Sequence, residues 1–139
     1  MEFQDLKNPD LYLSIMRKWY LCWLVLIFGC QTNEADAPEM LTEEAQQIGA
    51  TSVVMGAEIK EIGPVRPVQY GFLWDKQQDL SIIAAANKVV LGSAGEARKF
   101  SIKVDNLKSN TTYYYRGFAA NGDYTKIYYG NVATFTTLP

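Results

Sequence analysis

Histidine is absent from the 139 residues of this chain. Because histidine is the commonest general base and the commonest metal ligand, its absence excludes every Ser-His or Cys-His nucleophile. Cysteine occurs only twice, and 13 Lys and Arg residues stand against 15 Asp and Glu residues, for a formal net charge of -2. A strongly basic nucleic-acid-binding protein has a different charge balance. We therefore expect a protein that is not an enzyme, holds no cofactor and binds no nucleic acid.

What the chain does contain is a globular composition, with 48% hydrophobic and 20% charged residues. Its length allows one domain and an appendage. The carboxylates are scattered along the sequence and lack the dense spacing of a calcium loop, so we expect no metal site.

A single uncharged apolar run, WYLCWLVLIFG, extends from Trp19 to Gly29. This run has about half of the roughly 20 residues that a helix needs to cross a bilayer. Two basic residues precede it and Cys30 follows its last glycine, which is the order of a secretory signal. We therefore predict a signal peptide at residues 1–29. The alternative is a buried apolar helix or strand with an incidental cysteine.

The residues Leu26–Cys30, LIFGC, resemble a bacterial lipobox. This resemblance implies cleavage before Cys30, whose thiol and amino group then carry fatty acyl chains such as palmitate and anchor the protein in a lipid bilayer. The first fifteen residues hold three acids and one lysine, whereas a signal begins with basic residues, so we expect the true start at Met16. Since Cys22 leaves with the signal, no disulfide is expected in the mature chain.

Residues 30–39 are polar and acidic, with one proline and no apolar periodicity, and they predict a flexible tether. Glu34 and Asp36 resemble the signals that send some lipoproteins to the outer face of the outer membrane, although acids are also common in solvated linkers. We expect an outer-membrane lipid anchor, with the domain facing the periplasm or the cell surface.

Short β-like runs separated by turn residues fill residues 40–139, and no apolar period of 3.6 is sustained there. The expected strands are residues 40–44, 52–60, 68–74, 97–104, 113–120 and 128–136. The stretch from Asp79 to Leu91 fits either one helical turn or a short edge strand. Strand spacing near a dozen residues predicts an all-β sandwich.

The segment LKSNTTY, which contains Leu107, Thr111 and Tyr113, resembles the tyrosine corner of fibronectin type III domains, with Ser109 in place of the usual proline. Further resemblance lies in YGF at residues 70–72 and in YGNV at 129–132. The whole of residues 40–139 is similar to the fibronectin type III-like modules of lipoproteins from diderm bacteria. This resemblance implies a seven-stranded, two-sheet Greek-key sandwich in which Tyr113 is structural.

Side chains alternate between the two faces of a strand, so every second residue of the 113–119 segment points outward. The outward set, together with tyrosines of the neighbouring hairpin, predicts an aromatic and guanidinium binding surface. Its alternative is that the same side chains only cover the sheet as cross-strand pairs. The members of this candidate surface are Tyr114, Arg116, Phe118, Tyr124 and Tyr128.

These observations predict a membrane-anchored, non-enzymatic envelope lipoprotein. Its sandwich is expected to serve protein contact or to act as an accessory or structural module. A carbohydrate-binding surface lipoprotein of a polysaccharide-uptake system is the alternative.

Overall fold

A computed structural model describes residues 37–139 of the chain. The predicted signal peptide at residues 1–29, the start at Met16, the acylated Cys30 and most of the tether at residues 30–39 lie outside the described residues. Within residues 37–139, no helix is long and apolar enough to cross a membrane.

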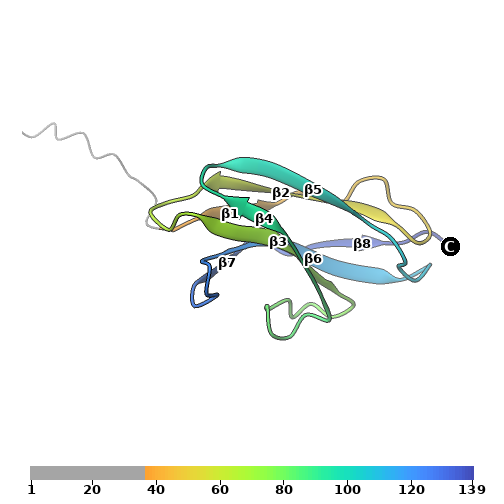
Figure 1. Ribbon diagram of the computed structural model, residues 1–139. Coiled ribbons are helices and arrows are strands. Elements are labelled where there is room, and N and C mark those ends of the chain that lie inside the picture. Colours follow the sequence, from red (N-terminus) through yellow and green to blue (C-terminus); the bar gives the residue numbers. More distant parts are fainter. Residues whose placement is uncertain (1–36) are drawn as a thin grey trace, which may run out of the picture. The chain divides into compact units, whose positions relative to one another are not determined.

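The described chain is all-β, as predicted, and its two antiparallel sheets form a sandwich (Figure 1). One sheet has the strand order β1-β2-β5, and the other has the order β4-β3-β6-β7, with β8 also paired to β6. The strands are β1 (Glu39–Thr42), β2 (Val53–Glu61), β3 (Val68–Asp75), β4 (Asn87–Ala94), β5 (Arg98–Val104), β6 (Thr112–Ala120), β7 (Ile127–Tyr129) and β8 (Ala133–Thr136).

The expected strand over residues 128–136 is wrong as a single element, because β7 and β8 pair with successive halves of β6 and are separated at residues 130–132. The break brings the chain against β1. A Cβ on Gly130 would lie 2.5 Å from Thr42 Oγ1, so only glycine allows this approach. The backbone amide of Thr42 donates to Asn131 Oδ1 at 2.9 Å, and Asn131 Nδ2 donates to the carbonyl of Thr42 at 3.2 Å. These bonds join the two sheets at their shared edge.

The stretch from Asp79 to Leu91 contains both elements that its sequence suggested. A turn closes where the Ala85 amide donates to the carbonyl of Ser81 at 2.9 Å, and β4 begins at Asn87. The apolar pair Val89-Val90 therefore lies in a strand that hydrogen-bonds only β3 and forms one edge of its sheet.

The core between the sheets is aromatic. The Phe100 ring of β5 lies 4.7 Å from the Tyr70 ring and 5.1 Å from the Phe72 ring of β3. Tyr113 and Tyr115 of β6 point inward, as the period of two predicted, and both are buried against Phe135. Rings therefore fill the inner positions of a domain that has no disulfide among its described residues.

The tyrosine corner predicted at the start of β6 is present. The hydroxyl oxygen of Tyr113 accepts a hydrogen bond from the amide of Lys108 at 3.0 Å. Leu107 is buried and its amide donates to the carbonyl of Thr51 at 3.0 Å, while the Thr111 amide donates to the hydroxyl of Thr137 at 2.9 Å. The connection between β5 and β6 is thereby fixed to both sheets.

We expect Tyr113→Phe to lower the free energy of unfolding by about 1–2 kcal/mol, because the Lys108 amide loses its acceptor in a partly buried place. Urea titration followed by circular dichroism measures the change. The control is Tyr114→Phe on the same strand, which removes a hydroxyl from a half-buried ring and should cost less. Equal stability of Tyr113→Phe and the wild type would contradict the structural role.

Candidate functional site

The predicted aromatic surface lies on the outer face of the β3-β6-β7 part of the second sheet, and the structure corrects its membership. Phe118 does point away from the main core, but its side chain is fully buried. The connection at residues 76–86 and the hairpin at 121–126 fold over this face and form a second apolar cluster with it. That outer cluster consists of Leu73, Phe118 and Ala120, packed against Ile82, Ala85, Tyr124, Ile127 and Tyr129.

Two other predicted members take different positions. Tyr128 packs against the main core, because the pairing of Ala119 with Tyr128 places Tyr129 on the outer face instead. Tyr124 lies in the outer cluster, with its hydroxyl donating to Gln69 Oε1 at 2.6 Å. The sequence did not predict Tyr129, since the pairing register with β6 decides which of the two adjacent tyrosines faces outward.

Arg116 and Tyr114 remain the half-buried members of the predicted surface. The guanidinium carbon of Arg116 lies 3.9 Å from the ring centroid of Tyr129, and the Tyr129 hydroxyl accepts a hydrogen bond from the Ile82 amide at 3.0 Å. The Nε of Arg116 is buried without a partner among the described residues. Burial lowers the pKa of this guanidinium, and smaller electrostatic interactions with Tyr129 and Asp79 act in the opposite direction. Arg116 thus helps to hold the 76–86 connection on the sheet.

The inner face holds one strongly perturbed group. Tyr115 is fully buried, its hydroxyl donates to the carbonyl of Glu43 at 2.5 Å, and burial raises its pKa to about 12, with smaller contributions from Glu44 and Glu43. A neutral phenol held in the core is a structural group rather than a proton donor for catalysis.

The raised pKa predicts alkaline destabilisation. Tyr115 ionises near pH 10 when unfolded and near pH 12 when folded, so its contribution to stability is complete below pH 10 and is lost between pH 10 and 12. We expect the unfolding midpoint to fall over this interval and to fall less steeply in Tyr115→Phe. Urea titrations at pH 9, 10 and 11 measure how steeply the midpoint falls with pH in the wild type and in Tyr115→Phe. Equal dependence on pH in the two proteins would contradict the role of Tyr115.

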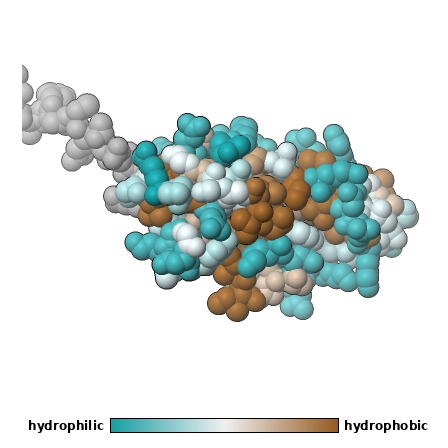
Figure 2. Space-filling model, in the orientation of Figure 1, coloured by the Kyte–Doolittle hydropathy of each residue, from teal (hydrophilic) through white to brown (hydrophobic). Residues whose placement is uncertain are grey.

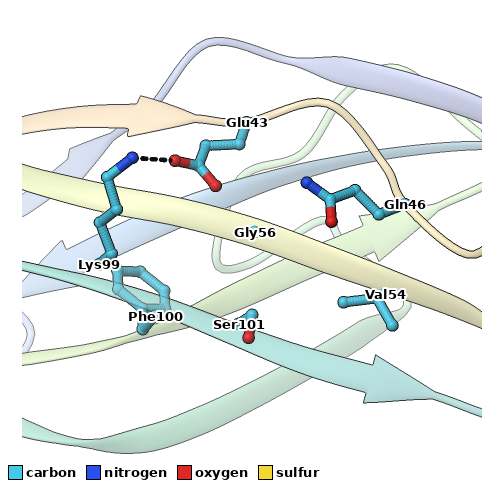
Figure 3. Close-up of a pocket in the computed structure, with 7 residues that line it drawn as sticks. All are labelled: Glu43, Gln46, Val54, Gly56, Lys99, Phe100 and Ser101. Carbon is cyan, nitrogen blue, oxygen red and sulfur yellow. Dashed lines mark hydrogen bonds and ion pairs between the residues drawn. The ribbon is translucent and has the colours of Figure 1, made fainter.

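A shallow hollow of about 250 Å³ lies over the outer face of the β1-β2-β5 sheet (Figure 3). Its floor is at Gly56, where a Cβ would lie 2.8 Å from Glu43 Oε2. Lys99 crosses the hollow to bond Glu43 at 2.8 Å, and this hydrogen bond and ion pair raise the pKa of Lys99. The two charges therefore neutralise each other at the surface of the hollow.

A larger hollow of about 440 Å³, here called the Trp74 hollow, lies at one end of the sandwich. It is bounded by the ends of β3 and β5, the start of β4 and the connection that leads to the tyrosine corner. It is lined by Trp74, Asp75, Lys76, Ala86, Asn87, Val104, Asp105, Asn106, Leu107 and Tyr113. The sequence predicts that Trp74 lies in a strand, but it does not predict the hollow, because the lining comes from four separate segments.

Residues 37–139 contain no group of three or more His, Cys, Asp or Glu side chains placed to hold a metal ion.

No family model matches the chain, and a search of curated proteins finds no match. Among solved structures, a sensor domain of the anti-sigma factor RsgI4 from Pseudobacteroides cellulosolvens superposes with a TM-score of 0.54 at 18% identity, over 75% of this chain and 97% of that one. A fibronectin type III domain of human fibronectin type III domain containing protein 3 superposes with a TM-score of 0.51 at 14% identity, over 78% and 93%. The fold is that of a fibronectin type III domain. In such a domain β7 and β8 together occupy the last strand position, which accounts for eight strands in a seven-strand arrangement.

Proposed function

We propose that this chain is a lipid-anchored, non-enzymatic envelope lipoprotein whose fibronectin type III domain presents a surface for protein contact. The observation that carries protein contact is the apolar surface at the edge of the second sheet. Ile83 is 94% exposed in the connection before β4, and Val90 is 42% exposed on β4 itself. Figure 2 shows apolar side chains gathered over β4 and protruding at that connection. Contiguous exposed apolar residues of this kind mark interaction sites.

The edge position of β4 supports the same proposal. A strand that pairs on one side only leaves backbone donors and acceptors open to a partner chain. Charged side chains on an edge strand discourage pairing. β4 carries one charge, Lys88 near its start, and has none from Val89 to its end at Ala94. A partner strand or loop that covers Val90 and Ile83 would satisfy both the apolar and the hydrogen-bonding groups.

Photo-crosslinking in intact cells tests protein contact. A photoreactive phenylalanine analogue at position 83 is expected to give a discrete crosslinked product, whereas the same analogue at exposed Thr136 on β8 should give none. Equal products from both positions, or none from either, would contradict a specific contact at this edge.

Lipid anchoring rests on the sequence LIFGC and on the basic residues before it. Mass spectrometry of the mature amino terminus is expected to find an acylated Cys30, and Cys30→Ser should release the protein from the membrane fraction. Protease treatment of intact cells then distinguishes the cell surface from the periplasm. An uncleaved terminus that carries no lipid would overturn the anchor without affecting the fold.

Carbohydrate binding in a polysaccharide-uptake system is the second candidate function. The observation that favours it is the Trp74 hollow, where one indole ring lies beside amide and carboxylate side chains. The outward surface on which sugar stacking was first expected is less suitable, because Phe118 is buried beneath two connections.

A further inference from the structure

We propose that the Trp74 hollow binds an uncharged saccharide unit, with the Trp74 ring as a stacking platform and the side chains of Asn106 and Asp105 as hydrogen-bonding groups. This inference deepens the carbohydrate candidate above and rests on it. The site differs from the predicted surface around Tyr114 and lies between the two sheets at one end of the domain.

The size and position of the hollow suit a ligand site. Its volume of about 440 Å³ falls within the usual range of roughly 300–1,000 Å³ for small-molecule sites. Val53 pairs with Val104 at this end of the sandwich, whereas Glu39 pairs with Glu61 at the other end. Since β2 spans nine residues, the hollow lies about 27 Å from the point where β1 begins. It therefore opens far from the start of β1.

The hollow has a fixed aromatic wall. Trp74 shares the inward face of β3 with Tyr70 and Phe72, but it is the last of the three and is half-buried because the core ends there. Its backbone is held on both sides, by pairing with Tyr115 and by the Asn87 side-chain amide, which donates to the Trp74 carbonyl at 3.2 Å. The Trp74 side chain also packs against the main core, so it loses little conformational freedom when a ligand packs on it.

The connection on one side of the hollow is also fixed. The two carboxylate oxygens of Asp75 accept hydrogen bonds from the amides of Lys76 at 2.6 Å and Ala86 at 2.8 Å, so this carboxylate closes the 76–86 connection. The opposite wall is held by the tyrosine corner. Both walls are therefore formed before any ligand arrives, which lowers the entropic cost of binding.

The opposite wall offers the polar groups that a ligand could reach. Within residues 37–139 the side-chain amide of Asn106 has no hydrogen-bond partner, and Asp105 forms one exposed ion pair, 2.9 Å from Lys103. An amide donates and accepts at once, as neighbouring sugar hydroxyls do, and a carboxylate accepts from two hydroxyls. An aromatic ring facing such groups matches the apolar face and hydroxyl rim of a pyranose.

Charge argues for a neutral ligand. The lining holds two carboxylates against one lysine, Lys76, so an anion would meet net negative charge. Each oxygen of Asp75 already accepts one backbone amide, and the half-exposed Asp105 is paired with Lys103. A basic peptide would therefore have to compete with these partners for either carboxylate.

Fluorescence titration of the full chain tests the proposal. The substitutions Trp19→Phe and Trp23→Phe leave Trp74 as the single tryptophan that fluoresces. The protein is kept in solution with a zwitterionic detergent, because a detergent with a sugar headgroup could itself occupy the site. The probes are maltotetraose, cellotetraose and xylotetraose, with tetralysine as the competing class. We expect saturable quenching or a blue shift with at least one saccharide and none with tetralysine.

Variants locate the binding. Asn106→Gly removes the free amide and keeps the positive φ of 62° accessible, and it is expected to weaken saccharide binding about five- to tenfold. The matched control is Asn110→Gly in the same connection, where φ is 47° and the side chain does not line the hollow. The saccharide affinity of this control should equal that of the protein with neither asparagine substituted. Calorimetry of Trp74→Phe should show a smaller loss than Trp74→Ala, whose folding is checked by circular dichroism.

Three results would overturn the assignment. The first is no response to any saccharide at about 10 mM, a concentration well above the Kd of a weak binding module. The second is equal saccharide affinity in Asn106→Gly and Asn110→Gly. The third is saturable binding of tetralysine but of no saccharide. None of these affects the tests of acylated Cys30 or of crosslinking at position 83. Failure of the saccharide site is therefore distinguishable from failure of the anchored contact module.

Discussion

Phe118→Ala is expected to lower the free energy of unfolding by about 3–5 kcal/mol, because it removes a fully buried ring from the outer cluster. The loss is of the size measured for aromatic truncations in cores, although Phe118 lies outside the space between the sheets. Removal of this ring also leaves a cavity beneath the 76–86 connection. Chemical denaturation followed by circular dichroism measures the change.

Tyr114→Ala is the matched control for this prediction. It truncates an aromatic ring on the same face of β6, four residues before Phe118, but the Tyr114 side chain is only half-buried. We expect a loss of about 1 kcal/mol. If the two variants lost equal stability, Phe118 would have to be exposed and the outer cluster would not exist in solution.

Gly71→Ala is expected to destabilise the domain by on the order of 3 kcal/mol or more. The register of β3 against β4 shifts between Tyr70 and Gly71, and the backbone of β4 approaches Gly71 so closely that a Cβ there would overlap the carbonyl oxygen of Val89. Backbone cannot turn aside as a flexible side chain can, so β4 must separate from β3. Thermal and urea unfolding measure the loss.

Gly122→Ala provides the control, since nothing lies within 4 Å of a Cβ at that hairpin position. Its stability should stay within about 0.5 kcal/mol of the wild type. Amide hydrogen exchange adds a local readout, with faster exchange along β4 in Gly71→Ala and no change there in Gly122→Ala. Unchanged protection of β4 in both variants would contradict the close approach.

The side chains that face the core between the two sheets were predictable, because successive residues of a strand alternate between its two faces. Tyr113 and Tyr115 lie inward as expected, and the tyrosine corner forms despite Ser109 at the proline position. The hydrogen bond needs only the hydroxyl of Tyr113 and the amide of Lys108, so proline contributes stiffness and not the bond itself.

The outer half was not predictable in the same way. Alternation says that Phe118 faces outward, but it does not say whether a connection distant in sequence lies over that face. The residues that cover it, among them Ile82 and Tyr124, come from segments with no regular period. The Trp74 hollow was not predictable for the same reason, since Trp74 lies in one sheet, Asn106 follows a strand of the other, and only the packing of the two sheets brings them together.

The hydrogen bonds between Asn131 and Thr42 affect how the domain responds to force. β1 begins at Glu39 and runs antiparallel to β2, so tension applied at Glu39 along the sandwich pulls the β1-β2 hydrogen bonds in shear, all at once rather than one after another. The Asn131 amide holds the inner end of β1 to the other sheet and adds two bonds that must break in the same event. These bonds therefore resist tension of the kind that the proposed lipid anchor would apply to β1. Single-molecule pulling from residue 39 is expected to show β1 detaching at a lower force in Asn131→Ala.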